Sequence, residues 1–264
     1  MKLSIIGSGN MGGAIARGLK NSNIIKSSDI YCADVSREVL NNIKAFNAEI
    51  NITTDSIKAV KNADIIIVAV KPWLLETVIN EIKETMDYER QIFVSLAAGI
   101  NFSNIYGFLK NENGDTPAIF RVVPNTAIEV KESANFISPY NASDKQIEIV
   151  KNIFDELGLT FIIEERLIGA ATSLSSCGIA FAFRYIRAAI EGAVEIGLNA
   201  ELAKKIELQT LRGAIELLEK NNNHPEAEID KVTTPGGITI KGLNAMEEAG
   251  FTNAVIKGLK ASLS

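Results

Sequence analysis

Histidine and cysteine are scarce in this chain of 264 residues, which holds one histidine, His224, and two cysteines, Cys32 and Cys177. A structural zinc site usually takes four such ligands, so the sequence predicts no metal centre. The two cysteines are far apart and form no C-x-x-C motif, which favours reduced thiols and a cytoplasmic location. There is also no G-x-S-x-G motif, so the sequence does not indicate the common nucleophilic hydrolase arrangement.

Positive charge and long apolar runs are limited as well. The chain carries 27 Lys and Arg against 32 Asp and Glu, with a net charge of -5 and no cluster of basic residues. Binding to nucleic acid needs a basic face, so we expect no nucleic-acid partner. Residues 167–183 carry no charge, but they include several hydroxyl residues and are barely long enough to span a membrane. We expect a buried core helix there, and no membrane contact.

Two halves of the chain show different periodicities. Apolar runs at residues 3–6, 30–33, 63–70, 91–96 and 118–123 predict strands, and the patterns at 10–19 and 37–46 predict helices. Alternating strands and helices predict a parallel sheet with right-handed crossovers, which is an α/β fold. After about residue 160 the patterns are helical, at 167–196, 199–219 and 243–259.

The helical half is too apolar to stand alone. A helix that is hydrophobic nearly all round must be buried. About a hundred residues of helix can hardly hide residues 167–196 by themselves. The sequence therefore predicts a dimer in which the helical halves cover each other.

Residues 7–12 read GSGNMG and fit the pattern G-x-G-x-x-G, between the first predicted strand and the first predicted helix. In a dinucleotide site, Gly7 would allow the tight turn and Gly9 would let a pyrophosphate approach the backbone. Gly12 would let the helix lie close to the sheet, with its N-terminal amides facing the phosphates. The alternative is a glycine-rich turn with packing roles alone.

Asp34 follows the second predicted strand, about twenty residues after Gly12, where a carboxylate usually binds the adenosine ribose. That position favours NADH, whereas Arg37 could meet the 2′-phosphate of NADPH. Asp34 could instead cap the following helix, a role that Ser36 could also take. The sequence leaves the choice between the two cofactors open.

Two further stretches follow strands whose carboxyl ends should meet a ligand. They are residues 69–73, AVKPW, and residues 96–99, LAAG. Ligands of open α/β sheets bind at that edge, and small residues there let ribose and nicotinamide come close. Ordinary strand-to-helix loops are the alternative for each.

The residues that could perform chemistry are few. His224 lies in a polar, proline-flanked stretch and is expected to be a loop residue, while Lys71 could serve as a base. A protonated imine accepts hydride readily and needs mainly to be held against the nicotinamide, so the shortage of histidine favours imine over ketone reduction. The turn at residues 233–243 could bind a substrate carboxylate through free amides, with hydroxyls from Thr234 and Thr239. A turn with a threonine cap is the alternative.

Over its whole length the chain resembles the pyrroline-5-carboxylate reductase family. The resemblance rests on residues 7–15, 70–72, 97–100 and 121–126, and above all on residues 230–239, DKVTTPGGIT. It implies a Rossmann-type doubly wound domain at 1–162, then an all-α dimerisation and substrate domain at 163–264. It also implies reduction of 1-pyrroline-5-carboxylate to proline by NADPH or NADH in a homodimer, with larger rings of dimers in the family.

The same resemblance implies the site residues. The turn from Gly236 through Gly237 and Ile238 to Thr239 would hold the substrate carboxylate by its amides, and the Thr239 hydroxyl would lie near the ring nitrogen as the catalytic group. Thr234 and Glu164 would complete the substrate site. The implied cofactor residues are Ile6, Gly7, Ser8, Gly9, Asn10, Met11, Gly12, Asp34, Arg37, Ser56, Ala69, Val70, Lys71, Pro72, Ala97, Ala98, Gly99 and Asn125.

Some positions depart from the family pattern. Residues 175–181 read SSCGIAF where the family usually has SGSGPAY, which removes a glycine, a proline and the tyrosine hydroxyl. Ser56 stands where many relatives have asparagine near the adenosine. Two alternatives follow: a β-hydroxyacid-type dehydrogenase that uses Lys71, and a non-catalytic nucleotide-sensing dimer, which the altered stretch motivates.

Overall fold

The computed structural model describes residues 1–263. The chain divides into two units, Met1–Ser176 and Cys177–Leu263. The first unit contains all of the strands in the described part of the chain, and the second consists of helices.

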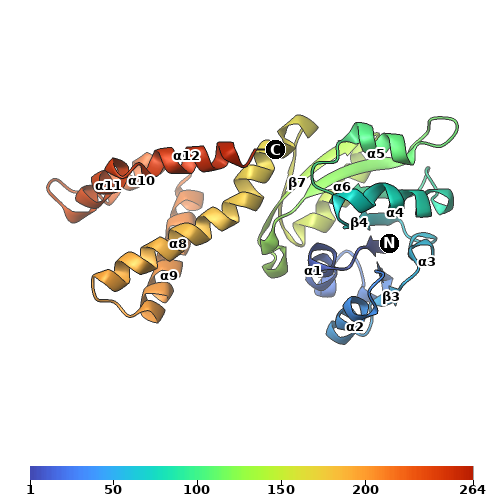
Figure 1. Cartoon of the computed structure of the whole chain (residues 1–264), viewed down its shortest axis with the longest axis horizontal. Coiled ribbons are helices and arrows are strands. Elements are labelled where there is room, and N and C mark those ends of the chain that lie inside the picture. The colour runs from blue at the N-terminus through green and yellow to red at the C-terminus, as the bar shows by residue number, and fades with distance from the viewer. Residues whose placement is uncertain (264) are drawn as a thin grey trace. The chain divides into compact units, whose positions relative to one another are not determined.

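One eight-stranded sheet forms the centre of the first unit, in the order β3-β2-β1-β4-β5-β6-β7-β8 (Figure 1). The first six strands are parallel, as predicted for five of them; the remaining one, at residues 51–53, was not predicted. β7 runs antiparallel to β6, and β8 runs parallel to β7. The strands are β1 (Leu3–Ile6), β2 (Ile30–Ala33), β3 (Asn51–Thr53), β4 (Ile65–Val68), β5 (Ile92–Ser95), β6 (Ala118–Val123), β7 (Ser133–Tyr140) and β8 (Gly158–Ile162).

The antiparallel strand β7 was not predicted, because the sequence indicated parallel strands only up to residue 123. A parallel connection needs a crossover of a dozen or more residues, usually through a helix. Between β6 and β7 the chain has a single short 3₁₀ turn, Thr126–Val130, so the chain can return only in the opposite direction.

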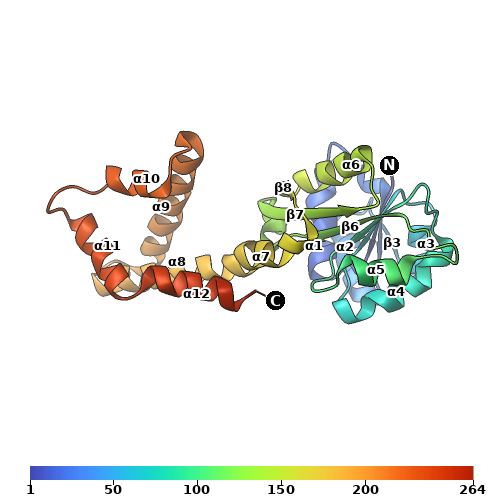
Figure 2. The ribbon, with the colours of Figure 1, turned by 90° about the horizontal axis from the view of Figure 1, so that it is seen from above.

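Helices cover both faces of the sheet. α1 (Asn10–Gly18), α2 (Arg37–Phe46) and α6 (Asp144–Asp155) pack in one buried cluster with Ile5, while α3 (Ser56–Val60), α4 (Leu75–Ile82) and α5 (Phe102–Leu109) pack in another with Ile6. Successive residues of a strand point to opposite faces of the sheet, so the neighbouring residues Ile5 and Ile6 pack in different clusters. Figure 2 shows α6 on one side of the sheet and α4 and α5 on the other. This doubly wound arrangement confirms the predicted Rossmann-type fold.

A long helix runs from Glu165 to Glu195. It comprises a 3₁₀ turn (Glu165–Leu167), α7 (Ile168–Thr172), a π-helical turn (Ser173–Cys177) and α8 (Gly178–Glu195). The π-helical turn overlaps the stretch that departs from the family pattern at residues 175–177. Such turns appear mostly as single insertions in α-helices.

The second unit continues with α9 (Ala200–Asn221), α10 (Pro225–Lys231), α11 (Ile238–Glu248) and α12 (Phe251–Ala261). α8 and α9 pack side by side, and α12 reaches α8 where the rings of Phe251 and Tyr185 meet with centroids 6.3 Å apart (Figure 1). The single helix predicted at 243–259 is two helices. Gly250 separates them with a φ of +85°, a conformation that glycine adopts at little cost.

Apolar side chains of the second unit lie open to solvent in a single chain. α8 contains no buried residue, and Ala203 is the one buried residue among 177–263. By length and composition alone, the helix Glu165–Glu195 is also apolar enough to cross a membrane, and 11% of its most apolar window is buried. Within one chain, therefore, residues 167–183 do not form the buried core helix that we predicted.

Candidate dinucleotide and substrate site

The glycine-rich loop connects β1 to α1 with the geometry that a dinucleotide site needs. Gly7 has a φ of +86°, and a Cβ there would lie 2.9 Å from the Ala69 carbonyl oxygen. A Cβ on Gly12 would lie 2.0 Å from the Gly7 carbonyl oxygen, so glycine is required there for close packing. A Cβ on Gly9 would meet nothing within 4 Å, and no side chain caps α1. The space in front of the first α1 amides is therefore open to an anion.

Asp34 lies directly after β2 and connects two loops. One carboxylate oxygen, Oδ2, accepts the backbone N–H of Ser8 at 2.8 Å, and the other, Oδ1, accepts that of Ser36 at 2.9 Å. Ser36 itself caps α2 by accepting the N–H of Val39. Asp34 therefore connects the glycine-rich loop to the β2–α2 turn. The N-cap of α2, which was the alternative role considered for Asp34, is Ser36. The exposed side chain of Arg37 lies on the first turn of α2.

The loops after β4 and β5 lie in sequence along the same carboxyl edge of the sheet as the glycine-rich loop. Ile6, Val68 and Ser95 end neighbouring parallel strands in register. Ala69 donates its N–H to the Ile6 carbonyl oxygen at 2.8 Å, and Leu96 donates to Val68 at 3.0 Å. Residues 69–72 thus start beside residue 7, and residues 97–99 start beside residues 69–72, because β4 lies between β1 and β5.

Ser56 and Asn125 occupy different surroundings near this edge. Ser56 is the first residue of α3 and follows β3, whose Thr53 carbonyl oxygen accepts the Asp34 N–H at 3.3 Å. Asn125 is buried after β6 and caps the 3₁₀ turn by accepting the Ala127 N–H at 2.9 Å. The Oδ1 atom of Asn125 therefore has a structural role as a cap.

The predicted substrate turn lies between α10 and α11 in the second unit. Gly236 has a φ of +74°, and Gly237 donates its N–H to the Thr234 carbonyl oxygen at 2.9 Å, which closes the turn. α11 starts directly afterwards, at Ile238, with no side chain capping its first amides. Thr239 lies in that first turn and is exposed. The predicted features, a tight turn with free amides beside two hydroxyl residues, are therefore present together.

The two acidic residues that precede α7 differ in their contacts. Glu164, which we predicted near the substrate, is exposed and pairs with Arg166 at 2.6 Å, and this pairing lowers the pKa of the Glu164 carboxyl. Glu165, which we did not predict, pairs at 2.7 Å with Arg121, whose side chain is 9% exposed. The sequence did contain a signal for this pair: Arg121 is a charged residue in the apolar run of β6. A buried guanidinium requires a carboxylate nearby, so an acidic partner could have been expected.

The remaining ionisable candidates do not form a catalytic cluster. His224 caps α10, where its Nδ1 accepts the Glu226 N–H at 3.3 Å. Lys71 is exposed before a 3₁₀ turn, Pro72–Leu74. Among the described residues, no group of three His, Cys, Asp or Glu side chains could hold a metal ion.

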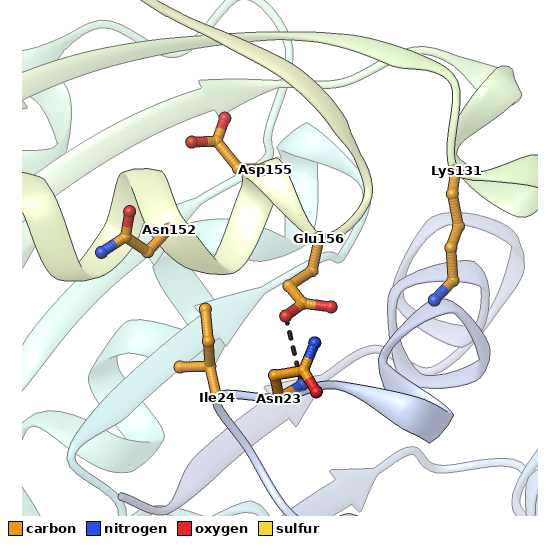
Figure 3. Close-up of a pocket in the computed structure, with 6 residues that line it drawn as sticks. All are labelled: Asn23, Ile24, Lys131, Asn152, Asp155 and Glu156. Carbon is orange, nitrogen blue, oxygen red and sulfur yellow. Dashed lines mark hydrogen bonds between the residues drawn. The ribbon is translucent and has the colours of Figure 1, made fainter.

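A pocket of about 480 Å³ lies away from all of these residues (Figure 3). Asn23 and Ile24 line one side, Asn152, Asp155 and Glu156 of the α6 end line another, and Lys131 faces them. The Asn23 N–H donates to Glu156 across it at 3.1 Å. None of the predicted site residues lines this pocket. The candidate site therefore consists of the loops described above and does not include this pocket.

Comparison with known proteins agrees with this geometry. Residues 165–264 match the family model for pyrroline-5-carboxylate reductase dimerisation, and residues 2–99 match that of the coenzyme F420-dependent NADP oxidoreductases. Pyrroline-5-carboxylate reductase 2 of Dictyostelium discoideum is 38% identical over 98% of this chain and 90% of its own length. The chain belongs to the pyrroline-5-carboxylate reductase family.

Two more relatives extend the comparison. Pyrroline-5-carboxylate reductase 1 of Dictyostelium discoideum is 41% identical over 98% of this chain, which spans about half, 48%, of that longer protein. The crystal structure of Plasmodium falciparum pyrroline carboxylate reductase with NADP bound is 30% identical, covers 100% of this chain and 95% of its own, and has a TM-score of 0.88. The predicted family and the predicted class, NAD(P)H-dependent oxidoreductases, are confirmed, and the two alternatives are not favoured.

Proposed function

We propose that this protein reduces the C=N bond of 1-pyrroline-5-carboxylate, with NADPH or NADH as the hydride donor, to give L-proline. The observation that carries the proposal is that one chain of this family contains both an open glycine-rich loop and a tight turn at Gly236 and Gly237. We assign dinucleotide binding to residues 1–162, and dimerisation with substrate binding to residues 163–264.

The residues of the first unit fit a dinucleotide. The open space at Gly9 and the free first amides of α1 suit the pyrophosphate. Asp34, Arg37 and Ser56 would lie at the adenosine end, and residues 69–72, 97–99 and Asn125 would border the ribose and nicotinamide. When bound, the reduced nicotinamide supplies the hydride.

The residues of the α11 turn would hold and protonate the substrate. Free amides at Ile238 and Thr239 would bind the carboxylate, since a helix N-terminus favours an anion. The Thr239 hydroxyl would donate a hydrogen bond, or a proton, to the ring nitrogen as the carbon of the C=N bond accepts hydride. Thr234 and Glu164 complete the proposed substrate contacts.

The uncovered helices support a homodimer, in agreement with the match to a dimerisation domain. A partner's helices would bury the apolar face that one chain leaves open, which accounts for the long apolar helix without a membrane. Larger rings of dimers, and a cytoplasmic location consistent with two free cysteines, are further parts of the proposal.

The test is a turnover assay with the purified protein, 1-pyrroline-5-carboxylate and either NADPH or NADH, followed by cofactor absorbance and by proline formation. We expect oxidation of at least one cofactor with an equal amount of proline. A parallel assay with β-hydroxy acids and the oxidised cofactors tests the dehydrogenase alternative. Tight cofactor binding with no turnover of any imine acid would contradict the proposal and favour a sensor.

A further inference from the structure

The sheet of the first unit contains an ion pair that the dinucleotide loops do not explain. Arg121 lies in β6 between buried apolar residues, and its guanidinium Nη1 pairs with Glu165 Oε1 at 2.7 Å. The guanidinium also lies 6.0 Å from the Phe102 ring centroid, so a cation–π contact holds it on a second side. A buried arginine with two such partners is fixed in one place.

Glu165 makes a second contact with the same oxygen atom. Its Oε1 accepts the backbone N–H of Phe102 at 2.6 Å. Phe102 is the first residue of α5, and its N–H has no acceptor within the helix. Asn101 caps a different amide, that of Asn104. A carboxylate at a helix N-terminus is also favoured by the helix dipole.

This contact anchors the far end of the β5–α5 loop, residues 96–101. At the near end, Leu96 donates its N–H to Val68, and Ser95 accepts the N–H of Ala97 through its hydroxyl at 3.3 Å. Ser95 is also the register partner of Arg121 in the neighbouring strand. The loop with Ala97 and Gly99 is therefore held at both ends, once by the sheet and once by Glu165.

We propose that Glu165, held by Arg121, is a positioning residue for hydride transfer. It fixes the loop at residues 97–99, which would set how the nicotinamide ring faces the substrate. Glu165 is also the first residue of the helix Glu165–Glu195, so its carboxylate links the start of that helix to the end of the loop. The inference rests on the proposed function, in which residues 97–99 border the nicotinamide.

The main test is the variant Glu165→Gln in the full-length protein. Misplacement of a reacting group by about 1 Å can cost on the order of 100-fold in rate, so we expect kcat to fall roughly 10- to 100-fold. The Kd for NADP⁺, measured by calorimetry, should stay unchanged, because the phosphate and adenosine contacts are elsewhere. The primary isotope effect with cofactor deuterated at the transferred position should rise, as hydride transfer becomes slower than the other steps.

A second variant covers the chance that Glu165→Gln leaves Arg121 unpaired and unfolds the protein. The double variant Arg121→Met/Glu165→Leu removes both charges, and apolar replacement of a buried ion pair often preserves folding. We expect it to fold, to bind NADP⁺ and to show the same loss of kcat with the same rise in the isotope effect.

The matched control is Asp64→Asn. Asp64 also pairs with an arginine, Arg90, at 2.7 Å and also accepts a backbone N–H, that of Lys2, at 2.8 Å. It lies before β4, at the amino edge of the sheet, away from the proposed cofactor loops. We expect the control to keep the wild-type kcat and isotope effect.

The outcomes separate the inference from the proposed function. If the wild-type protein does not turn over the imine, the proposed function fails and the inference falls with it. If the wild-type protein is active and a folded Glu165 variant keeps the wild-type kcat and isotope effect, the inference alone is overturned. Failure of both variants to fold would also overturn it, because the pair would then be structural.

Discussion

The Asp34 carboxylate accepts the backbone N–H of Ser8 at 2.8 Å, which joins the end of β2 to the glycine-rich loop. The same side chain occupies the position that contacts the adenosine ribose in this fold. Asp34 thus has a structural role, and substitution can test the recognition role that we propose for it.

Replacing Asp34 with serine should shift cofactor use toward NADPH. Serine removes the negative charge that would repel a 2′-phosphate and leaves Arg37 as the charged group nearby. We expect the ratio of kcat/KM for NADPH over NADH to rise by roughly tenfold, which corresponds to about 1.4 kcal/mol. Steady-state kinetics with both cofactors measure it, and Asp155→Asn on α6 is the control. An unchanged ratio would show that Asp34 does not select the cofactor and acts only by connecting the two loops.

Gly12→Ala should lower the stability of the protein, whereas Gly9→Ala should weaken cofactor binding. At Gly12 the new Cβ would clash with the Gly7 carbonyl oxygen, so we expect a loss of stability of about 1–3 kcal/mol or more. At Gly9 the Cβ meets no protein atom, so thermal unfolding should hardly change while the Kd for NADP⁺ rises at least tenfold. Calorimetry measures both quantities. Wild-type affinity in Gly9→Ala would contradict the placement of the pyrophosphate.

Thr239→Val should lower kcat with little effect on folding. Valine has nearly the shape of threonine but lacks the hydroxyl that would meet the ring nitrogen, and loss of a proton donor costs on the order of 100-fold. Thr239→Ser should restore most of the rate. Thr252→Val, which removes a surface hydroxyl bonded to Glu247 on the same unit, is the control. Equal activity of the valine and serine variants would show that the Thr239 hydroxyl is not catalytic.

Phe183→Glu should weaken the dimer. The Phe183 side chain is 64% exposed on α8, where a partner's apolar face would bury it, and a charge there would lose its hydration. Sedimentation velocity should show a lighter species than the wild type at equal concentration. Phe46→Glu, at a phenylalanine 42% exposed on α2 of the first unit, should keep the wild-type mass. A dimer that tolerates Phe183→Glu would place the interface elsewhere.

Cys32 should stay unreactive in the folded protein. Burial raises the pKa of its thiol from 9.0 to about 12, and the thiolate is the reactive form. Because the folded pKa is the higher one, stability from the neutral thiol is complete below pH 9 and is lost as the pH rises toward 12. Mass spectrometry of a Cys177→Ser variant after alkylation at neutral pH should find Cys32 unmodified until urea is added. Rapid native alkylation would contradict its burial.

The sequence predicted the dinucleotide half well because its signals are local. The glycine spacing and the apolar run of β4 each determine a conformation by their own sterics and burial. The direction of β7 was not predicted, since a strand of mixed polarity carries no signal of its partner. Glu164 was predicted by resemblance, and Glu165 was not predicted, because its contact with Arg121 joins residues 44 positions apart in sequence.

The second unit shows the limits of periodicity in another way. The Pro-Gly-Gly turn was predicted from its residue types. In contrast, α11 begins at Ile238, before the predicted helix at 243–259, and the break at Gly250 lay within that one apolar pattern. The apolar surface of α8 was predicted to be buried, and one chain cannot bury it. Periodicity identifies an apolar face but does not say which molecule covers it.

The exposure of α8 has a thermodynamic consequence. If a second copy provides most of the burial of Cys177–Leu263, the folding of this half follows mass action, and its apparent melting temperature depends on the protein concentration. Dilution alone would then loosen the helices of the second unit, including those beside the proposed substrate turn, while the sheet of the first unit, with its own core, would stay folded. Specific activity would in that case decline on dilution before any loss of dinucleotide binding.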